Sequence, residues 1–154
     1  MMRILAALLF FLIAPHAHAY CIYNDTEREV SVVQEKHPNA MRDERKLNRV
    51  LAPKSHVCCE FHKLDCNPEG RQNAVLSLEV RILGAPPWVC GYPEGAEPNV
   101  KVTGAGTIRI LPNSRKSAFP YVVRVRTHDR KDLTGPRGVP CTEPKDKPQP
   151  KGKK

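Results

Sequence analysis

Apolar and polar residues alternate with a period of two along several short stretches of the chain. The clearest stretch covers residues 74–82, AVLSLEVRI, in which every second residue is apolar. Because successive side chains of a β-strand point to opposite faces, this pattern predicts a strand with one buried face. We expect the buried face to carry Ala74, Leu76, Leu78, Val80 and Ile82.

Two further patterns follow towards the C-terminus. The sequence Gly-Ala-Gly at residues 104–106 is flanked by Val100 and Val102 on one side and by Ile108 and Ile110 on the other. This pattern predicts a β-hairpin. Residues 119–126 again alternate, with Tyr121, Val123 and Val125 on the apolar side. Pro120 has no amide hydrogen, so we expect this strand to begin at a sheet edge or a bulge.

The N-terminal half has the same character. Residues 20–23 and 29–33 are rich in β-forming residues on either side of an Asn-Asp turn, and residues 50–61 suggest a second hairpin around APKS at 52–55. Residues 39–50 fit a helix and a solvated loop equally well. About seven short strands separated by turn residues predict an all-β fold, a small antiparallel β-sandwich.

The first residues predict export. Arg3 precedes an unbroken apolar run at residues 4–14, which is too short to span a bilayer as a helix. Ala17 and Ala19 then supply the small residues of a cleavage site. We therefore interpret residues 1–19 as a signal peptide of a secreted or periplasmic protein. Tyr20 argues against lipidation at Cys21, because that site needs a small residue before the cysteine.

The other end predicts a tail. Residues 142–154, TEPKDKPQPKGKK, have no apolar side chain except their prolines, so they cannot bury surface to offset the entropy of ordering. We expect a disordered basic tail here and a single domain over residues 20–141. No segment of that domain is apolar enough to cross a membrane. The whole chain has a formal net charge of +9.

Six cysteines follow the signal peptide, and residues 56–66, HVCCEFHKLDC, hold three of them. An even number in a small exported protein predicts disulfides. In a strand Cys58 and Cys59 point to opposite faces, so we expect them to have different partners. Cys66 and Cys90 each precede a Pro-Glu-Gly turn, which suggests that they bond to one another. Cys58 and Cys59 would then bond, in either order, to Cys21 and Cys141.

The same segment admits a metal-binding alternative. His56, Cys58 and His62 would share one face of an extended strand, with Cys66 as a fourth ligand. These are ligand types for copper or zinc. Their spacing matches no structural zinc pattern, and the chain has no paired CxxC motif. We therefore expect no cofactor, and a periplasmic or extracellular metal-binding protein is the second interpretation.

Catalytic motifs are absent from the sequence. It holds no GxSxG, HExxH, P-loop or dinucleotide fingerprint, and six bonded cysteines leave no thiol nucleophile. We expect no enzyme. The third interpretation is a small secreted hydrolase or nuclease that uses His56, His62, His128 and Lys63 for acid–base chemistry, although nothing places His128 near the others.

Strand alternation also predicts a basic surface. If the apolar residues of the C-terminal strands point inward, then Lys101, Arg109, Arg124, Arg126 and His128 point outward. On neighbouring strands they would form a patch that attracts an anionic polymer, such as a polysaccharide, or acidic lipid headgroups. Nucleic acid is not expected, because few aromatic residues accompany the arginines. The alternative is an ordinary wet sheet face.

A loop rich in proline is the second candidate binding element. Residues 84–98 hold four prolines, Trp88 and Tyr92, residue types that anchor protein–protein interfaces. The alternative is that Trp88 closes the end of the sandwich. Asn24-Asp25-Thr26 is a sequon for N-glycosylation. Together these features predict an exported, non-enzymatic binding or structural protein.

Overall fold

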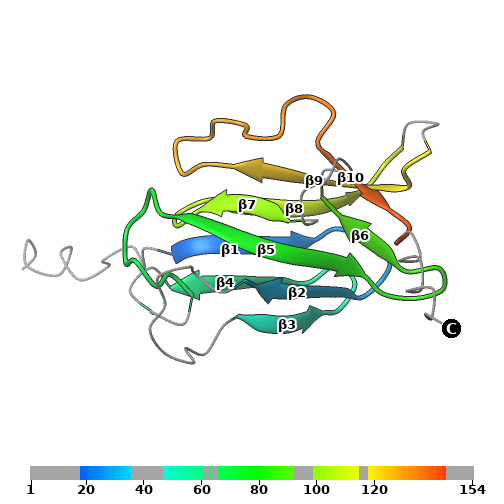
Figure 1. Cartoon of the computed structure of the whole chain (residues 1–154), viewed down its shortest axis with the longest axis horizontal. Coiled ribbons are helices and arrows are strands. Elements are labelled where there is room, and N and C mark those ends of the chain that lie inside the picture. Colours follow the sequence, from blue (N-terminus) through cyan, green and yellow to red (C-terminus); the bar gives the residue numbers. More distant parts are fainter. Residues whose placement is uncertain are drawn as a thin grey trace, which may run out of the picture.

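The computed structural model describes residues 18–35, 47–60, 63, 66–91, 99–114 and 118–144. Every regular element among those residues is a β-strand (Figure 1). The strands are β1 (His18–Asn24), β2 (Val30–Gln34), β3 (Asn48–Leu51), β4 (His56–Glu60), β5 (Val75–Ile82), β6 (Trp88–Cys90), β7 (Val100–Thr103), β8 (Thr107–Pro112), β9 (Tyr121–Arg126) and β10 (Val139–Thr142).

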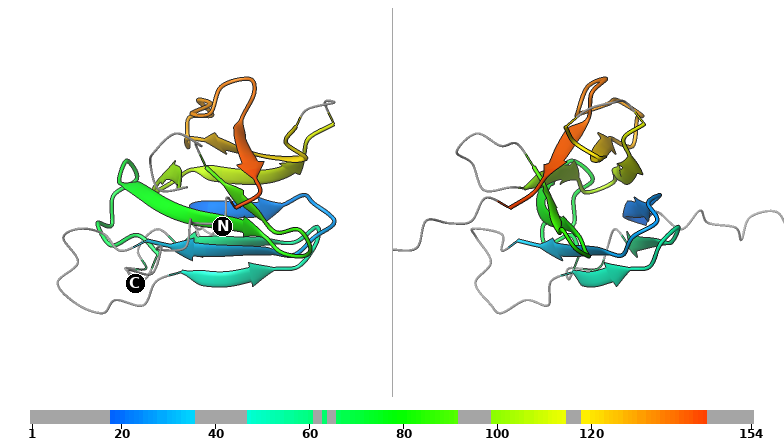
Figure 2. Two further views of the ribbon diagram at one scale, coloured as in Figure 1. Left: turned by 45° about the vertical axis from the view of Figure 1, so that its right-hand side comes forward. Right: turned by 90° about the vertical axis from the view of Figure 1, so that its right-hand side faces the viewer.

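The strands form two packed layers. The first sheet has the order β4-β1-β8-β9, and the second has β3-β2-β5 with β6 and β7 both on the far side of β5. All pairs are antiparallel except β1 with β8. β10 joins the layers, since Val139 pairs with β9 and Cys141 pairs with β6 (Figure 2). The all-β antiparallel sandwich is therefore confirmed, and β10 closes one side of it almost into a barrel.

Alternating apolar residues from both sheets fill the core. Residues 74–82 follow the predicted pattern, with all five predicted core residues buried and Val75 exposed. Val100, Val102, Ile108 and Ile110 are buried as well. The Tyr20 hydroxyl donates to Gln34 Oε1 at 3.2 Å inside the sandwich, and burial raises the pKa of that hydroxyl. This bond links the two sheets within the core.

Both predicted hairpins are wrong in their pairing. The turn at residues 103–106 exists, with the Gly106 amide donating to the Thr103 carbonyl at 2.9 Å. However, β7 pairs with β5 in the second sheet, and β8 pairs with β1 and β9 in the first. Similarly, β3 pairs with β2 and β4 pairs with β1. A short turn between alternating runs has the same sequence pattern whether the strands pair or cross between sheets.

Asn24 fixes another connection that crosses between the sheets, from β1 to β2. It is 1% exposed, and its Nδ2 donates to the carbonyls of Arg28 at 2.8 Å, Leu51 at 3.2 Å and Ala52 at 2.9 Å. Its Oδ1 accepts from the amide and hydroxyl of Thr26 at 3.1 and 2.7 Å. The folded domain therefore has no room for a glycan on the Asn24 sequon.

The ends of the domain differ slightly from the prediction. β10 runs through Thr142, which pairs with Val89, so the first residue of the predicted tail belongs to a strand. β1 begins at His18, two residues before the predicted cleavage point. The rest of the predicted signal peptide, residues 36–46 and residues 145–154 lie outside the described residues. Within the described part of the chain there is no helix that could span a membrane.

Candidate anion-binding groove

Three disulfides connect the six cysteines: Cys21–Cys58, Cys59–Cys66 and Cys90–Cys141. The prediction that Cys58 and Cys59 bond to different partners is confirmed, and Cys59 is buried while Cys58 is half-buried. The predicted Cys66–Cys90 bond is wrong, as is a bond from Cys141 to Cys58 or Cys59. The reason lies in strand pairing, which sets Cys90 directly opposite Cys141 and Cys21 opposite Cys58.

This pairing overturns the proposed metal ligand set. The sulfurs of Cys58 and Cys66 are both in disulfide bonds, so neither is available as a thiolate ligand. His62 lies outside the described residues. Among the residues that are described, no three His, Cys, Asp or Glu side chains are grouped to hold a metal ion.

The candidate acid–base residues do not converge either. His56 is on β4 at the edge of the first sheet, and His128 follows β9, with β1 and β8 between these strands. The Lys63 ammonium pairs with the Glu60 carboxylate at 3.0 Å. The structure therefore does not bring His56, His128 and Lys63 to one reacting point, and His62 is not described.

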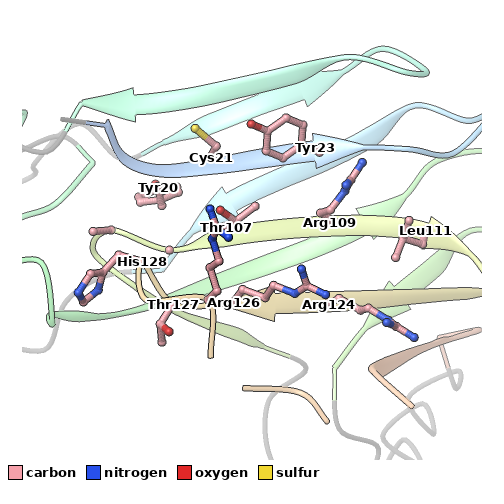
Figure 3. Close-up of a pocket in the computed structure, with 13 residues that line it drawn as sticks. Tyr20, Cys21, Tyr23, Thr107, Arg109, Leu111, Arg124, Arg126, Thr127 and His128 are labelled. Atoms are coloured by element: carbon pink, nitrogen blue, oxygen red, sulfur yellow. The ribbon is translucent and has the colours of Figure 1, made fainter. Parts of the chain in front are cut away.

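The outward face of the first sheet gathers the predicted arginines in rows. Strand register sets His56 opposite Tyr23, Tyr23 opposite Arg109, and Arg109 opposite Arg124. The next row, two residues along each strand, is Cys58, Cys21, Thr107 and Arg126. Six residues of these rows line an open groove of about 720 Å³: Cys21, Tyr23, Thr107, Arg109, Arg124 and Arg126. Figure 3 shows how they lie. The charged and polar lining of the groove includes Thr107, Arg109, Arg124, Arg126, Thr127, His128 and Arg130.

Three planar side chains of the first row, His56, Tyr23 and Arg109, are stacked in sequence. The rings of Tyr23 and His56 are stacked with centroids 5.2 Å apart, and Arg109 Cζ lies 5.5 Å from the centre of the Tyr23 ring. Because β4 and β8 flank β1, these two neighbours lie on opposite sides of the Tyr23 ring. Both faces of that ring are therefore occupied.

Arg109 is paired with a carboxylate. Its Nε and one Nη donate to the two oxygens of Asp25 at 2.8 and 3.1 Å, a bidentate ion pair. The hydrogen bonds to Asp25 raise the pKa of Arg109 above its usual value. At this end of the groove the positive charge is therefore compensated.

Arg124 is held by the loop that follows β9. One of its Nη atoms donates to the Pro136 carbonyl at 3.2 Å, and its Nε is buried without an acceptor among the described residues. The prediction that Arg124 simply faces water is therefore incomplete, because the side chain is half-buried and supports this loop.

The opposite end of the groove carries uncompensated charge. Arg126 and Arg130 are exposed, line the groove, and have no carboxylate partner within the described part of the chain. His128 is exposed between them. Arg130, in a turn with φ of 65°, was missed by the alternation argument, which applies only to strands. Tyr23 and Asp25 were missed because the parallel pairing of β1 with β8 has no signal in sequence.

Lys101 does not join this surface. It is exposed on β7, which pairs with β5 in the second sheet. The five predicted outward residues therefore divide into four that line the groove, Arg109, Arg124, Arg126 and His128, and one, Lys101, on the other layer.

The second predicted binding element is described only in part. Trp88 lies on β6, is half-buried, packs against the core and meets the edge of Tyr121 with centroids 6.3 Å apart. These contacts favour the structural role of closing the sandwich. Tyr92 lies outside the described residues.

Comparisons with protein-family models, curated proteins and solved structures found no match for this chain. Functional inference therefore depends on the geometry of the groove.

Proposed function

We propose that this protein is a non-enzymatic binding protein that acts in an oxidising compartment, exported by residues 1–19, and recognises an anionic polysaccharide through the groove on its first sheet. Three disulfides and no free cysteine are typical of secreted and periplasmic proteins. The cleaved signal peptide is the simplest account of how such a chain reaches that compartment.

The observation that carries the proposal is the gathering of basic side chains along one hollow. Two adjacent strands and the turn after them supply five basic side chains that line the same groove: Arg109, Arg124, Arg126, His128 and Arg130. A concave surface of one charge sign concentrates counter-charged ligands and speeds their association. Cleavage of residues 1–19 removes one charged residue, Arg3, so the net charge falls from +9 to +8 and still acts in the same direction.

The aromatic content of the groove favours a polysaccharide over a nucleic acid. Proteins that bind single-stranded nucleic acid stack bases on aromatic rings. The outward rows hold two aromatic rings, Tyr23 and His56, which stack on one another, and Arg109 lies over Tyr23 as well. A hydrated chain of anionic sugars needs charge and hydroxyl contacts, which Arg126, Arg130 and Thr107 can supply.

Retention on immobilised heparin tests the proposal. The double variant Arg126→Gln/Arg130→Asn removes two charges from the open end of the groove, and Asn tolerates the left-handed backbone at position 130. Its matched control, Arg49→Gln/Lys101→Asn, removes two exposed charges from the second sheet. We expect the groove variant to elute at clearly lower salt than the control, and retention of all proteins to fall steeply with salt.

A third protein separates the groove from net charge alone. Deleting residues 145–154 removes most of the predicted basic tail and leaves β10 intact. If this deletion, or the control variant, lowers retention as much as the groove variant does, binding depends on total charge and the proposal is refuted. Stronger binding to anionic lipid vesicles than to heparin would replace the polysaccharide with a membrane surface.

A further inference from the structure

The Asp25 carboxylate binds to Arg109 in the geometry that an anionic ligand would adopt. Its two oxygens lie 2.8 and 3.1 Å from Arg109 Nε and Nη, and its side chain keeps 29% of its surface exposed. The side chains of the pair come from positions 84 residues apart in sequence, joined by the parallel pairing of β1 with β8. Arg109 is thus presented with a planar, two-oxygen carboxylate, held in bidentate geometry.

The backbone of Asp25 is fixed independently of this ion pair. Its amide donates to the Ile110 carbonyl at 2.9 Å, and its own carbonyl accepts from Lys54 Nζ at 2.9 Å. Asn24, directly before it, is buried and fully hydrogen-bonded. The Asp25 carboxylate can therefore leave Arg109 by side-chain rotation alone, without a change in the fold.

We propose that Asp25 is a tethered placeholder for a ligand carboxylate, and that the groove binds a linear polysaccharide of uronic acids. One uronate carboxylate replaces Asp25 on Arg109, and another along the same polymer binds to Arg126 and Arg130. This inference rests on the proposed function and adds to it the chemical class of the ligand.

Strand geometry supports two anion subsites on one polymer. Arg109 and Arg126 are on neighbouring strands and are offset by two residues, so their Cα atoms are about 8 Å apart for a rise near 3.3 Å and a strand spacing near 4.8 Å. The Arg109 fork faces Asp25, so a ligand carboxylate that replaces Asp25 there leaves Arg126 available for a second carboxylate. A polymer with a carboxylate on each sugar can reach both arginines, and the second contact is then intramolecular.

Calorimetric titration with polygalacturonate and with dextran sulfate tests this inference. Asp25→Asn frees Arg109, so we expect it to tighten polygalacturonate binding about three- to fivefold, the scale of an exposed ion pair. Glu27→Gln is the matched control, because it removes the same charge two residues away, where Glu27 pairs with Lys54 instead. It should change affinity less than Asp25→Asn does. The gain in affinity caused by Asp25→Asn should disappear in a protein that also carries Arg109→Gln, because that protein has no guanidinium group at position 109.

The outcomes separate this inference from the proposed function. Suppose that Asp25→Asn weakens polygalacturonate binding, or changes its affinity no more than Glu27→Gln does, while Arg126→Gln/Arg130→Asn still weakens binding. Asp25 is then not a placeholder for a ligand carboxylate, and the groove remains the proposed binding site. An equal gain for dextran sulfate refutes the carboxylate class, because that polymer carries only sulfates. If neither groove variant alters binding of either polymer, the proposed function itself fails. Unchanged melting temperatures of the variants show that these differences arise at the groove.

Discussion

Asn24 shows at the scale of one residue how much of this fold depends on a single polar side chain. It makes five hydrogen bonds in a buried site and connects the turn after β1 to residues 51 and 52. The sequence marks Asn24-Asp25 as a turn and equally as a glycosylation sequon. The Asn24 side chain is buried against the carbonyls of Leu51 and Ala52, 27 and 28 residues away. These distant contacts exclude a glycan on Asn24, and the local sequence gives no sign of them.

Asn24→Ala should therefore be strongly destabilising. It leaves buried carbonyl and amide groups without partners, each at a cost of about 1–3 kcal/mol, so we expect a loss of about 3 kcal/mol or more in the free energy of unfolding. Urea denaturation measures this loss. Asn113→Ala, which removes an exposed bond to the Phe119 carbonyl, should cost about 1 kcal/mol or less. Equal losses for the two variants would contradict the account of Asn24.

Asp132 orders the loop beside the groove. Its Oδ1 accepts from the Thr134 amide and hydroxyl at 2.8 Å and from the Gly135 amide at 3.0 Å, and the Thr134 amide chiefly lowers the pKa of Asp132. A carboxyl whose pKa is lower in the folded state stabilises the fold above its unfolded pKa, about 3.9. That contribution is lost as the pH falls through the lower, folded value.

Asp132→Ala should thus cost stability at neutral pH but not in acid. We expect a loss of about 1 kcal/mol at pH 7, the size of a capping interaction. The difference from the unaltered protein should shrink as the pH falls below 3.9. Thermal unfolding at several pH values measures both. A difference that stays constant with pH would show that the charge of Asp132 has no part in the stabilisation.

At the scale of the elements, strand faces could be predicted from sequence and strand partners could not. The alternation in residues 74–82 correctly assigned every inward side chain of β5. Two short strands, β6 and β10, were missed because three or four residues beside prolines give no clear period. Pairing depends on contacts between distant segments, and it is pairing that sets Cys90 opposite Cys141 and Tyr23 beside Arg109.

The disulfides should differ in their contributions to stability. Cys90–Cys141 closes a separation of 51 residues and joins β6 to β10, whereas Cys59–Cys66 closes a separation of seven. By the loop-closure relation the longer loop contributes about 4 kcal/mol and the shorter about 2.4 kcal/mol. Cys90→Ala/Cys141→Ala should therefore lower the free energy of unfolding more than Cys59→Ala/Cys66→Ala does. The reverse order in chemical denaturation would count against this account of how β10 closes the sandwich.

At the scale of the whole molecule, charge is divided between the two layers. Lys101 and Arg49 are exposed on strands of the second sheet, while the first sheet collects three predicted arginines with Arg130 and His128 around one groove. Alternation predicted that Arg109, Arg124 and Arg126 face outward. It could not predict that Lys101 lies on the other layer or that Asp25 neutralises Arg109, because both depend on the sheet order.

The most direct test of the groove as the binding site is a map of amide chemical shifts. A heparin oligosaccharide is titrated into the isotopically labelled protein, and backbone signals are followed by nuclear magnetic resonance. We expect the largest changes at Thr107, Arg109, Arg126, Thr127 and Arg130, the strand ends and turn that line the groove. Signals of β3 and β7 on the second sheet should change little. Shifts that centre on the second sheet or on residues 145–154, with the groove signals unchanged, would contradict the account.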